Sequence, residues 1–131
     1  MKEYLHLRCG SCELLMDAAC VEAVDFINDT QRDSSGRRLW RDEALPVLDL
    51  TVALGMTGAS RQQIVISAGE CGRRCIMEVE EILDLRRVDA SEWRHFAPVT
   101  PEAQRFFDGA LSLPDGRCLL RLRQPLPWFQ S

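Results

Sequence analysis

The sequence predicts a mostly β fold in which two similar small β units pack together. Short segments of alternating apolar and polar residues recur along the chain, separated by glycine and other turn-forming residues. The same series of elements also occurs twice along the chain. It consists of a strand, a glycine-centred turn, a return strand carrying Met16-Asp17 or Met77-Glu78, and a third strand rich in Val and Ile. Units of this size are marginally stable alone, so the repeat indicates that both belong to one domain.

The opening segment has the plainest strand pattern. Leu5, Leu7 and Cys9 alternate with His6 and Arg8 and stop at a Gly-Ser turn, which is typical of a half-buried strand. His6 falls on the outward side of this alternation and is predicted to be an exposed or edge polar residue. Further strands in the first half are predicted over residues 13–17, 21–27 and 45–50.

Pro46 and Gly55 define the end of the first half. Pro46 has no N–H to donate, so its strand is predicted to lie at a sheet edge or to pair on only one side at that residue. Residues 51–54 are predicted to form one helical turn that Gly55 closes. The second half is predicted to contain strands over 63–68, 75–79 and 82–88, a short helix within 89–96, another near Thr100, and a hairpin over 111–123.

Composition limits the classes of protein to which the chain can belong. It has 131 residues, of which 46% are hydrophobic and 27% charged, as is ordinary for one globular domain. A net charge of −4 gives no basic field for phosphates, so nucleic acid is not expected as a partner. No apolar run approaches the roughly 20 residues of a membrane span, and the first residues lack the layout of a signal peptide. We therefore expect a cytoplasmic protein without direct membrane insertion.

Catalytic patterns are missing from the sequence. His6 and His95 belong to no recognisable triad or metal-ligand arrangement. Neither a glycine-rich phosphate loop nor a Gly-x-Ser-x-Gly elbow occurs. The chain is expected to work by binding, without catalysis and without a cofactor.

Six cysteines leave one alternative open. In a reducing compartment thiols stay free and are most simply small buried hydrophobic residues. Cys9-Gly-Ser-Cys12 and Cys71-Gly-Arg-Arg-Cys75 nevertheless supply two close pairs, which formally resemble a zinc ribbon. Against zinc, the second pair is more widely spaced, and both pairs straddle predicted hairpin turns. A small zinc-binding or redox module is the alternative function.

Charged residues are predicted to gather in surface patches of opposite sign. Acidic residues within 78–84 are typical of a solvated face. Complementary patches would fix the orientation of a docked partner, although an ordinary mixed-charge surface explains the composition equally well. The basic residues concerned are Arg37, Arg38, Arg41, Arg86, Arg87, Arg121 and Arg123.

The run from residue 41 to residue 50 resembles the signature of CheW-like domains, in which an Asn-Leu-Arg-Gly turn leads into a strand ending Pro-Val-Ile-Asp-Leu. The residues that match are Arg41, Pro46, Val47, Asp49 and Leu50. Three further segments resemble the family in the right order, so the resemblance extends over about residues 4–123. They are 7–24, like the first hairpin and following strand, 79–82, and 107–120, like the closing hairpin.

The resemblance implies a fold of two five-stranded, SH3-like barrels packed around a shared core, with one or two short helices. The chain would be a single CheW-like domain over residues 1–131, with intertwined subdomains at roughly 1–61 and 62–123 and a short tail at 124–131. It would act as a non-enzymatic adaptor between chemoreceptor cytoplasmic tips and the regulatory domain of a CheA-type histidine kinase. Other CheW-like domains are further expected partners, and receptors would recruit the adaptor to the inner membrane face.

The resemblance also assigns partner-binding residues. Arg41 matches the signature arginine, which is linked to receptor and kinase coupling. Val21, Glu22 and Val24 match the strand that faces the receptor groove. Trp40 replaces the leucine of the family's turn. Asp42 replaces its glycine, so the turn loses its residue specialised for positive φ and gains a charge. These departures predict a divergent member that serves a chemosensory pathway other than flagellar chemotaxis.

Overall fold

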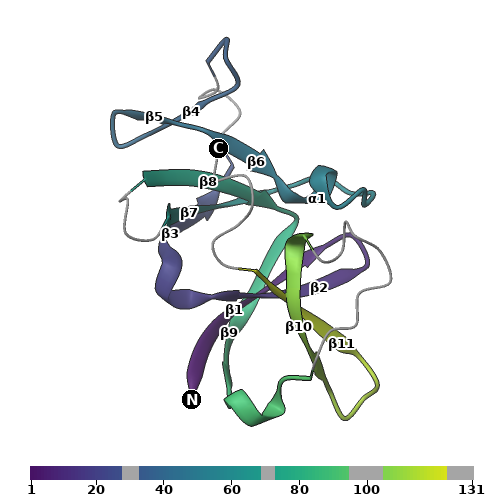
Figure 1. Ribbon diagram of the computed structural model, residues 1–131. Coiled ribbons are helices and arrows are strands. Elements are labelled where there is room, and N and C mark those ends of the chain that lie inside the picture. Colours follow the sequence, from purple (N-terminus) through teal and green to yellow (C-terminus); the bar gives the residue numbers. More distant parts are fainter. Residues whose placement is uncertain (28–32, 69–72, 95–104, 124–131) are drawn as a thin grey trace.

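The computed structural model describes residues 1–27, 33–68, 73–94 and 105–123, which form a mostly β protein (Figure 1). Its strands are β1 (Lys2–Cys9), β2 (Cys12–Asp17), β3 (Val21–Phe26), β4 (Arg38–Trp40), β5 (Glu43–Leu45), β6 (Val47–Asp49), β7 (Gln62–Ala68), β8 (Arg73–Val79), β9 (Glu81–Val88), β10 (Phe107–Ser112) and β11 (Cys118–Leu122). Its helical elements are α1 (Leu50–Ala53) and short 3-10 helices at Ala18–Cys20 and Ala90–Glu92. The predicted helix near Thr100 and the tail from residue 124 lie outside the described residues.

The strands form two main sheets and a hairpin. The first sheet has the order β10-β11-β2-β1-β9, the second has the order β3-β7-β8-β6, and β4 pairs with β5. Each main sheet is built around an antiparallel hairpin, β1–β2 or β7–β8. In each, the return strand also pairs in parallel with a strand from the other half of the chain, β11 beside β2 and β6 beside β8. The predicted repeat is therefore present in the topology.

The third strand of each unit crosses into the sheet of the other unit. β3 follows the β1–β2 hairpin but pairs with β7, and β9 follows the β7–β8 hairpin but pairs with β1. This exchange is visible in Figure 1, where β9 runs from the second sheet down along β1. Each sheet thus contains strands from both halves of the chain. The division into subdomains near residue 61 stays a prediction.

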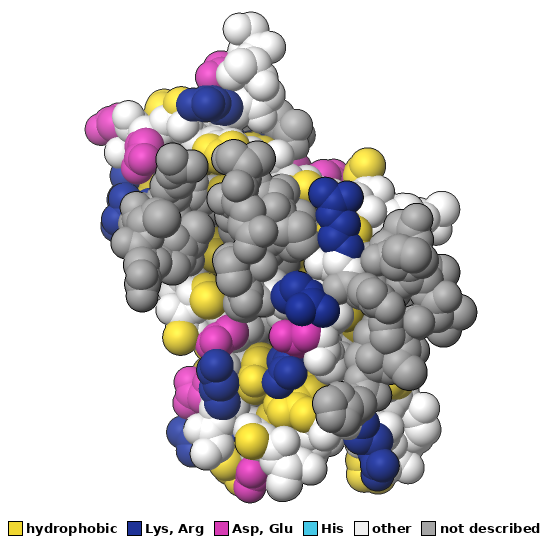
Figure 2. All heavy atoms as spheres, in the orientation of Figure 1, with side chains coloured by type: hydrophobic (Ala, Val, Ile, Leu, Met, Phe, Trp, Pro, Cys, Tyr) yellow, Lys and Arg dark blue, Asp and Glu magenta, His cyan; other side chains and the backbone are white. Residues whose placement is uncertain are grey.

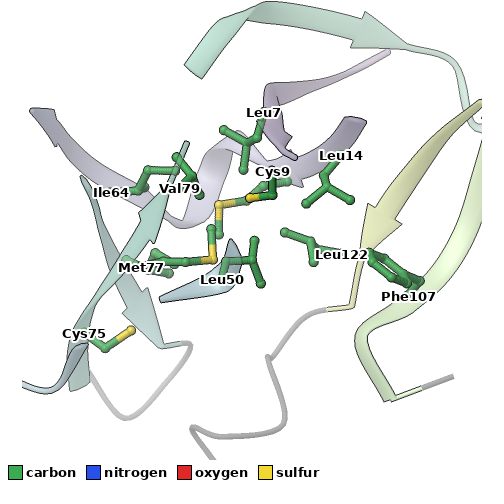
Figure 3. Close-up of a cluster of buried hydrophobic side chains, with 12 residues drawn as sticks. Leu7, Cys9, Leu14, Leu50, Ile64, Cys75, Met77, Val79, Phe107 and Leu122 are labelled. Atoms are coloured by element: carbon green, nitrogen blue, oxygen red, sulfur yellow. The ribbon is translucent and has the colours of Figure 1, made fainter. Parts of the chain in front are cut away.

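The buried hydrophobic side chains form three clusters. The largest takes side chains from both sheets and from α1, so it forms the core that the two units share (Figure 3). A buried Leu or Ile contributes about 1.5–3 kcal/mol through the area it removes from water. The shared core includes Leu7, Cys9, Leu14, Met16, Leu50, Ile64, Met77, Val79 and Leu122. The smaller clusters are Tyr4, Leu15, Val88, Leu111 and Leu119 in the first sheet, and Leu45, Val65 and Ile76 around β5, β7 and β8.

Local sequence explains the elements that follow the β4–β5 hairpin. β6 lies at a sheet edge, as predicted from Pro46, whose carbonyl accepts a hydrogen bond from the N–H of Ile76 at 2.9 Å. Asp49 caps α1, because its carboxylate accepts the N–H of Val52 at 3.3 Å. Gly55 follows the helix with a φ of +69°, a conformation that favours glycine. The predicted edge strand and helical turn are therefore confirmed.

The prediction that His6 is exposed is wrong. The residue is only 3% exposed, and both ring nitrogens lie near carboxylates of neighbouring strands. Nε2 is 3.1 Å from Oε1 of Glu13 on β2, and Nδ1 is 3.2 Å from Oδ1 of Asp84 on β9. A histidine with such partners can be buried without losing its hydrogen bonds. Alternation along β1 shows which face His6 occupies, but it does not show that side chains of two neighbouring strands cover that face.

Candidate protein-interaction surface

Arg41 and Asp42 form the tip of the β4–β5 hairpin. Trp40 pairs with Glu43, so a two-residue turn connects the strands, and φ is +48° at Arg41 and +64° at Asp42. Positive φ at both central residues is the requirement of a type I′ hairpin turn. Aspartate enters this left-handed region more readily than most residues. The turn therefore keeps its conformation although it contains no glycine.

Arg41 displays its charge at this tip. The residue is exposed, and its Cζ lies 4.5 Å from the centroid of the Trp40 ring. The Trp40 side chain is half buried and packs against the cluster of Leu45, Val65 and Ile76. A cation–π contact at an exposed site contributes about 0.5–1 kcal/mol. The contact directs the guanidinium without removing it from solvent.

Arg74 on β8 joins this hairpin to β3. Its Nε donates a hydrogen bond to Oε2 of Glu22 at 2.6 Å, and its Nη1 lies 3.6 Å from Oε2 of Glu43. Its guanidinium is also 5.9 Å from the Trp40 ring. The hydrogen bond and the charge of Glu22 raise the pKa of Arg74, and Glu43 adds to the effect. We call the set of Glu22, Trp40, Arg41, Glu43 and Arg74 the hairpin cluster.

Sequence reasoning missed Arg74 and Trp40 as members of this surface. Trp40 was noted only as a departure from the family signature. Arg74 was placed in a turn, whereas the structure places it within β8, opposite Ser67 of β7. Strand alternation beyond the turn is the one signal that indicates which way its side chain points.

The other predicted partner-binding residues lie on β3 and differ in how exposed they are. Glu22 lies at a register shift, where β3 has one residue more than β7. Val21 is half buried and packs against the shared core, whereas Val24 is 51% exposed. The structure thus brings Glu22 next to the Arg41 turn, while Val24 lies further along the strand.

A groove lies where the end of β3 meets the start of β9. It has a volume of about 540 Å³ and contains the side chain of Phe26, which is 72% exposed. Arg8 forms an ion pair with Glu81 across the groove wall and lies 3.6 Å from Glu80. Exposed aromatic side chains beside charged groups are typical of surfaces that bind other proteins. The remaining lining residues of this β3–β9 groove are Ala59, Arg61, Gln62 and Ile82.

A buried ion pair anchors the hairpin from beneath. Nη2 of Arg38 on β4 donates to Oε2 of Glu78 on β8 at 2.6 Å, and the two side chains are only 2% and 3% exposed. The prediction that Arg38 and the acidic residues near 78 lie on the surface is therefore wrong for this pair. Composition shows that charged residues are present, but it does not show that two of them pair between strands far apart in the sequence. Separating the two side chains would leave buried charges without this ion pair, which is strongly unfavourable. The pair therefore fixes the position of the hairpin on β8.

The rest of the visible surface carries mixed charge. On the face drawn in Figure 2, Lys and Arg side chains lie beside Asp and Glu in both the upper and the lower parts of the molecule. This agrees with an ordinary mixed-charge surface on that face. The hairpin cluster and the β3–β9 groove are therefore distinguished by their geometry and not by net charge.

The cysteines of the zinc or redox alternative lie mainly in the core. Cys9 and Cys12 face each other across the β1–β2 turn, Cys75 lies in β8, and all three belong to or pack against the shared core. Burial raises the pKa of Cys75 to about 12 and also raises those of Cys9 and Cys12. Zinc binds thiolates, which such thiols do not readily form. Cys71 lies outside the described residues, so the four-cysteine site stays a prediction.

Within residues 1–27, 33–68, 73–94 and 105–123, no three His, Cys, Asp or Glu side chains lie close enough together to hold a metal ion. The same part of the chain contains no helix with the length and apolar character needed to cross a bilayer.

Comparisons with known proteins agree with this architecture. A family model described as the CheW-like domain matches residues 3–125. A search of curated proteins finds no match. Among solved structures, the chain is similar to the scaffolding protein TtCheW from Thermoanaerobacter tengcongensis, with a TM-score of 0.75 and 18% identity over 93% of this chain and 88% of that chain. The predicted fold of two SH3-like subdomains is thereby confirmed.

Proposed function

Because the chain belongs to the CheW-like domain family, we propose that it couples chemoreceptor cytoplasmic tips to the regulatory domain of a CheA-type histidine kinase. CheW-like scaffolding proteins are non-enzymatic, so the chain acts by binding. The observation that carries this proposal is the family match, which extends over residues 3–125. The similar solved structure is itself that of a scaffolding protein.

The hairpin cluster supports a role in kinase docking. Arg41 projects its charge from a turn, and its stacking on Trp40 limits the directions that the side chain can take. Arg74 holds Glu22 and Glu43 beside it, so positive and negative groups occupy defined places on one surface. Complementary charges across an interface fix the orientation of the partner. The same surface is suited to another CheW-like domain.

The β3–β9 groove supports receptor docking. The exposed side chain of Phe26 lines the groove, and the exposed Val24 lies two residues before it on β3. Charges along the wall come from Arg8, Glu80 and Glu81. A receptor tip that is helical can place an apolar stripe in such a groove. Receptor binding would hold the chain in the cytoplasm at the inner membrane face, in a chemosensory pathway other than flagellar chemotaxis.

Binding measurements on the purified chain test the proposal. Titration calorimetry with a CheA-type regulatory domain, and separately with a soluble receptor-tip fragment from the same cell, should show binding without turnover. Arg41→Glu should weaken kinase binding about tenfold, which corresponds to ~1.4 kcal/mol. Arg87→Glu is the matched control, because Arg87 is an exposed arginine on β9, remote from the hairpin.

Two results would contradict the proposal. One is that the wild-type chain binds neither partner and no other CheW-like domain. The other is that Arg87→Glu weakens kinase binding as much as Arg41→Glu, because the effect would then be one of net charge. Circular dichroism of Arg41→Glu must show a folded β protein, since loss of the fold would give Arg41 a structural role instead.

A further inference from the structure

Two thiols begin neighbouring strands at the same end of the first sheet. β2 starts at Cys12 and β11 starts at Cys118, and the two strands pair in parallel with Leu14 opposite Leu120. Continued two residues back from these paired residues, the register would place Cys12 opposite Cys118. Neighbouring strands are about 4.7–4.9 Å apart, which is within the roughly 4.4–6.8 Å that separates the Cα atoms of disulfide-bonded cysteines.

The two side chains also share one face of the sheet. Side chains alternate along a strand, so Cys12 lies on the face of Leu14 and Cys118 on the face of Leu120. Leu14 belongs to the shared core, and both Cys12 and Leu120 pack against it. The two sulfur atoms therefore project to the same side of adjacent strands.

Cys118 and Cys12 differ in their access to solvent. Both are free thiols, but Cys118 is exposed whereas Cys12 is partly buried. Burial raises the pKa of Cys12, and the charges of Cys9 and Cys118 raise it further, so Cys12 stays protonated at neutral pH. Because Cys118 is open to solvent, a soluble oxidant meets it first.

We propose that Cys118 and Cys12 form a peroxide-responsive dithiol in which Cys118 reacts first and Cys12 completes the disulfide. The Cys118 thiolate attacks one oxygen of hydrogen peroxide, the O–O bond breaks, and the product is a Cys118 sulfenic acid. The second oxygen leaves as hydroxide and takes up a proton to give water. The Cys12 sulfur then attacks the sulfenic sulfur, an S–S bond forms, and the hydroxyl leaves with the Cys12 proton as a second water. The two thiols lose two electrons and the peroxide gains two.

This bond would tie together residues that lie far apart in the sequence. In a reducing cell both thiols are free, and disulfides in such compartments are usually transient and redox-sensing. Oxidation would add a covalent link between β2 and β11, which already pair as parallel strands. Because the closed loop includes most of the chain, the thermal midpoint of unfolding should rise on the order of 5–10 °C.

Peptide mapping tests the assignment directly. The reduced full-length chain is exposed to hydrogen peroxide, the remaining thiols are alkylated, and the chain is digested with trypsin and a glutamate-specific protease. We expect a linked pair of the peptides 9–13 and 118–121 without reductant, and its loss when reductant is added. The linkage should persist in Cys9→Ala and in the control Cys20→Ala, and it should vanish in Cys12→Ala and Cys118→Ala.

Other oxidation products would overturn the proposal. These are a bond between Cys9 and Cys12, a disulfide-linked dimer through Cys118, or a sulfinic acid at Cys118 with Cys12 still open to alkylation. The Cys118→Ala variant keeps the test decisive, because an exposed side chain at the start of a strand is not needed for folding. Neither receptor nor kinase binding enters the measurement, so the outcome is independent of the proposed adaptor function.

Discussion

The guanidinium of Arg74 on β8 reaches the carboxylate of Glu22 on β3, with 2.6 Å between Nε and Oε2. β7 lies between these two strands in the second sheet, so the ion pair passes over an intervening strand. The same arginine lies near Glu43 and Trp40 of the β4–β5 hairpin. One exposed side chain thus sets the relative position of an edge strand and the turn that carries Arg41.

Arg74→Gln should weaken kinase binding several-fold while the thermal midpoint of unfolding changes little. Exposed ion pairs contribute little to stability, but loss of this one frees Glu22 and the hairpin from each other. Glu22→Gln should weaken binding by a similar factor, and the double variant should be no weaker than either single variant. Additive losses in calorimetric titrations would show that the two residues act separately.

Arg38→Met should destabilise the fold by about 3–5 kcal/mol, because the buried carboxylate of Glu78 would lose its ion pair with Arg38. Urea unfolding followed by circular dichroism measures the loss. The double variant Arg38→Met with Glu78→Leu should recover much of it, since both buried charges are then absent. A double variant as unstable as the single one would mean that the pair stabilises the fold by its own attraction.

Stability should fall as the pH rises from about 9 towards 12. Burial raises the pKa of the Cys75 thiol from its ordinary value of 9.0 to about 12, so the folded state holds a proton that the unfolded state loses. The contribution of the Cys75 proton to the free energy of unfolding is therefore complete below pH 9. It disappears as the pH passes through the pKa of the thiol in the folded state. Urea unfolding across this range should give a shallower decline for Cys75→Val than for the wild type. Equal slopes would show that other groups control the alkaline loss.

Gly10→Ala should destabilise the chain more than Gly36→Ala. Both glycines have positive φ, +61° and +83°, so both substitutions strain the backbone by about 1 kcal/mol. At Gly10 the new Cβ would also lie 2.9 Å from Cβ of Met56 and 3.0 Å from the carbonyl oxygen of Thr57, whereas at Gly36 no atom of the described residues lies within 4 Å. Thermal unfolding of the two variants compares the effects, and equal midpoints would show that the Met56 segment moves aside freely.

Local patterns explain which parts of the fold were predictable. β1, the edge position of β6 and the turn of α1 follow from alternation, from proline and from glycine, all of which act within a few residues. The burial of His6 could not be predicted, because it depends on carboxylates supplied by β2 and β9. The ion pair of Arg38 and Glu78 is hidden for the same reason, since 40 residues separate its partners.

The candidate site shows the same division. Resemblance to a signature indicated Arg41 and Asp42, because a turn motif is continuous in sequence. Arg74 belongs to the surface because β8 pairs with β7 and brings its side chain near Glu43 of the hairpin, which is a tertiary relationship. The groove at Phe26 likewise arises from two strand ends that meet after the chain has crossed between sheets.

The crossing strands make the molecule a rigid connection between its two ends. Only Glu80 separates β8 from β9, so nearly continuous backbone runs from beneath the hairpin cluster into the first sheet. A fragment with either half alone would lack two or more strands of each main sheet, so neither half could form a complete sheet without the other. Two proteins bound at opposite ends of such a rigid domain are held at a fixed spacing and angle. A displacement of one is therefore transmitted to the other and is not absorbed by deformation of the domain.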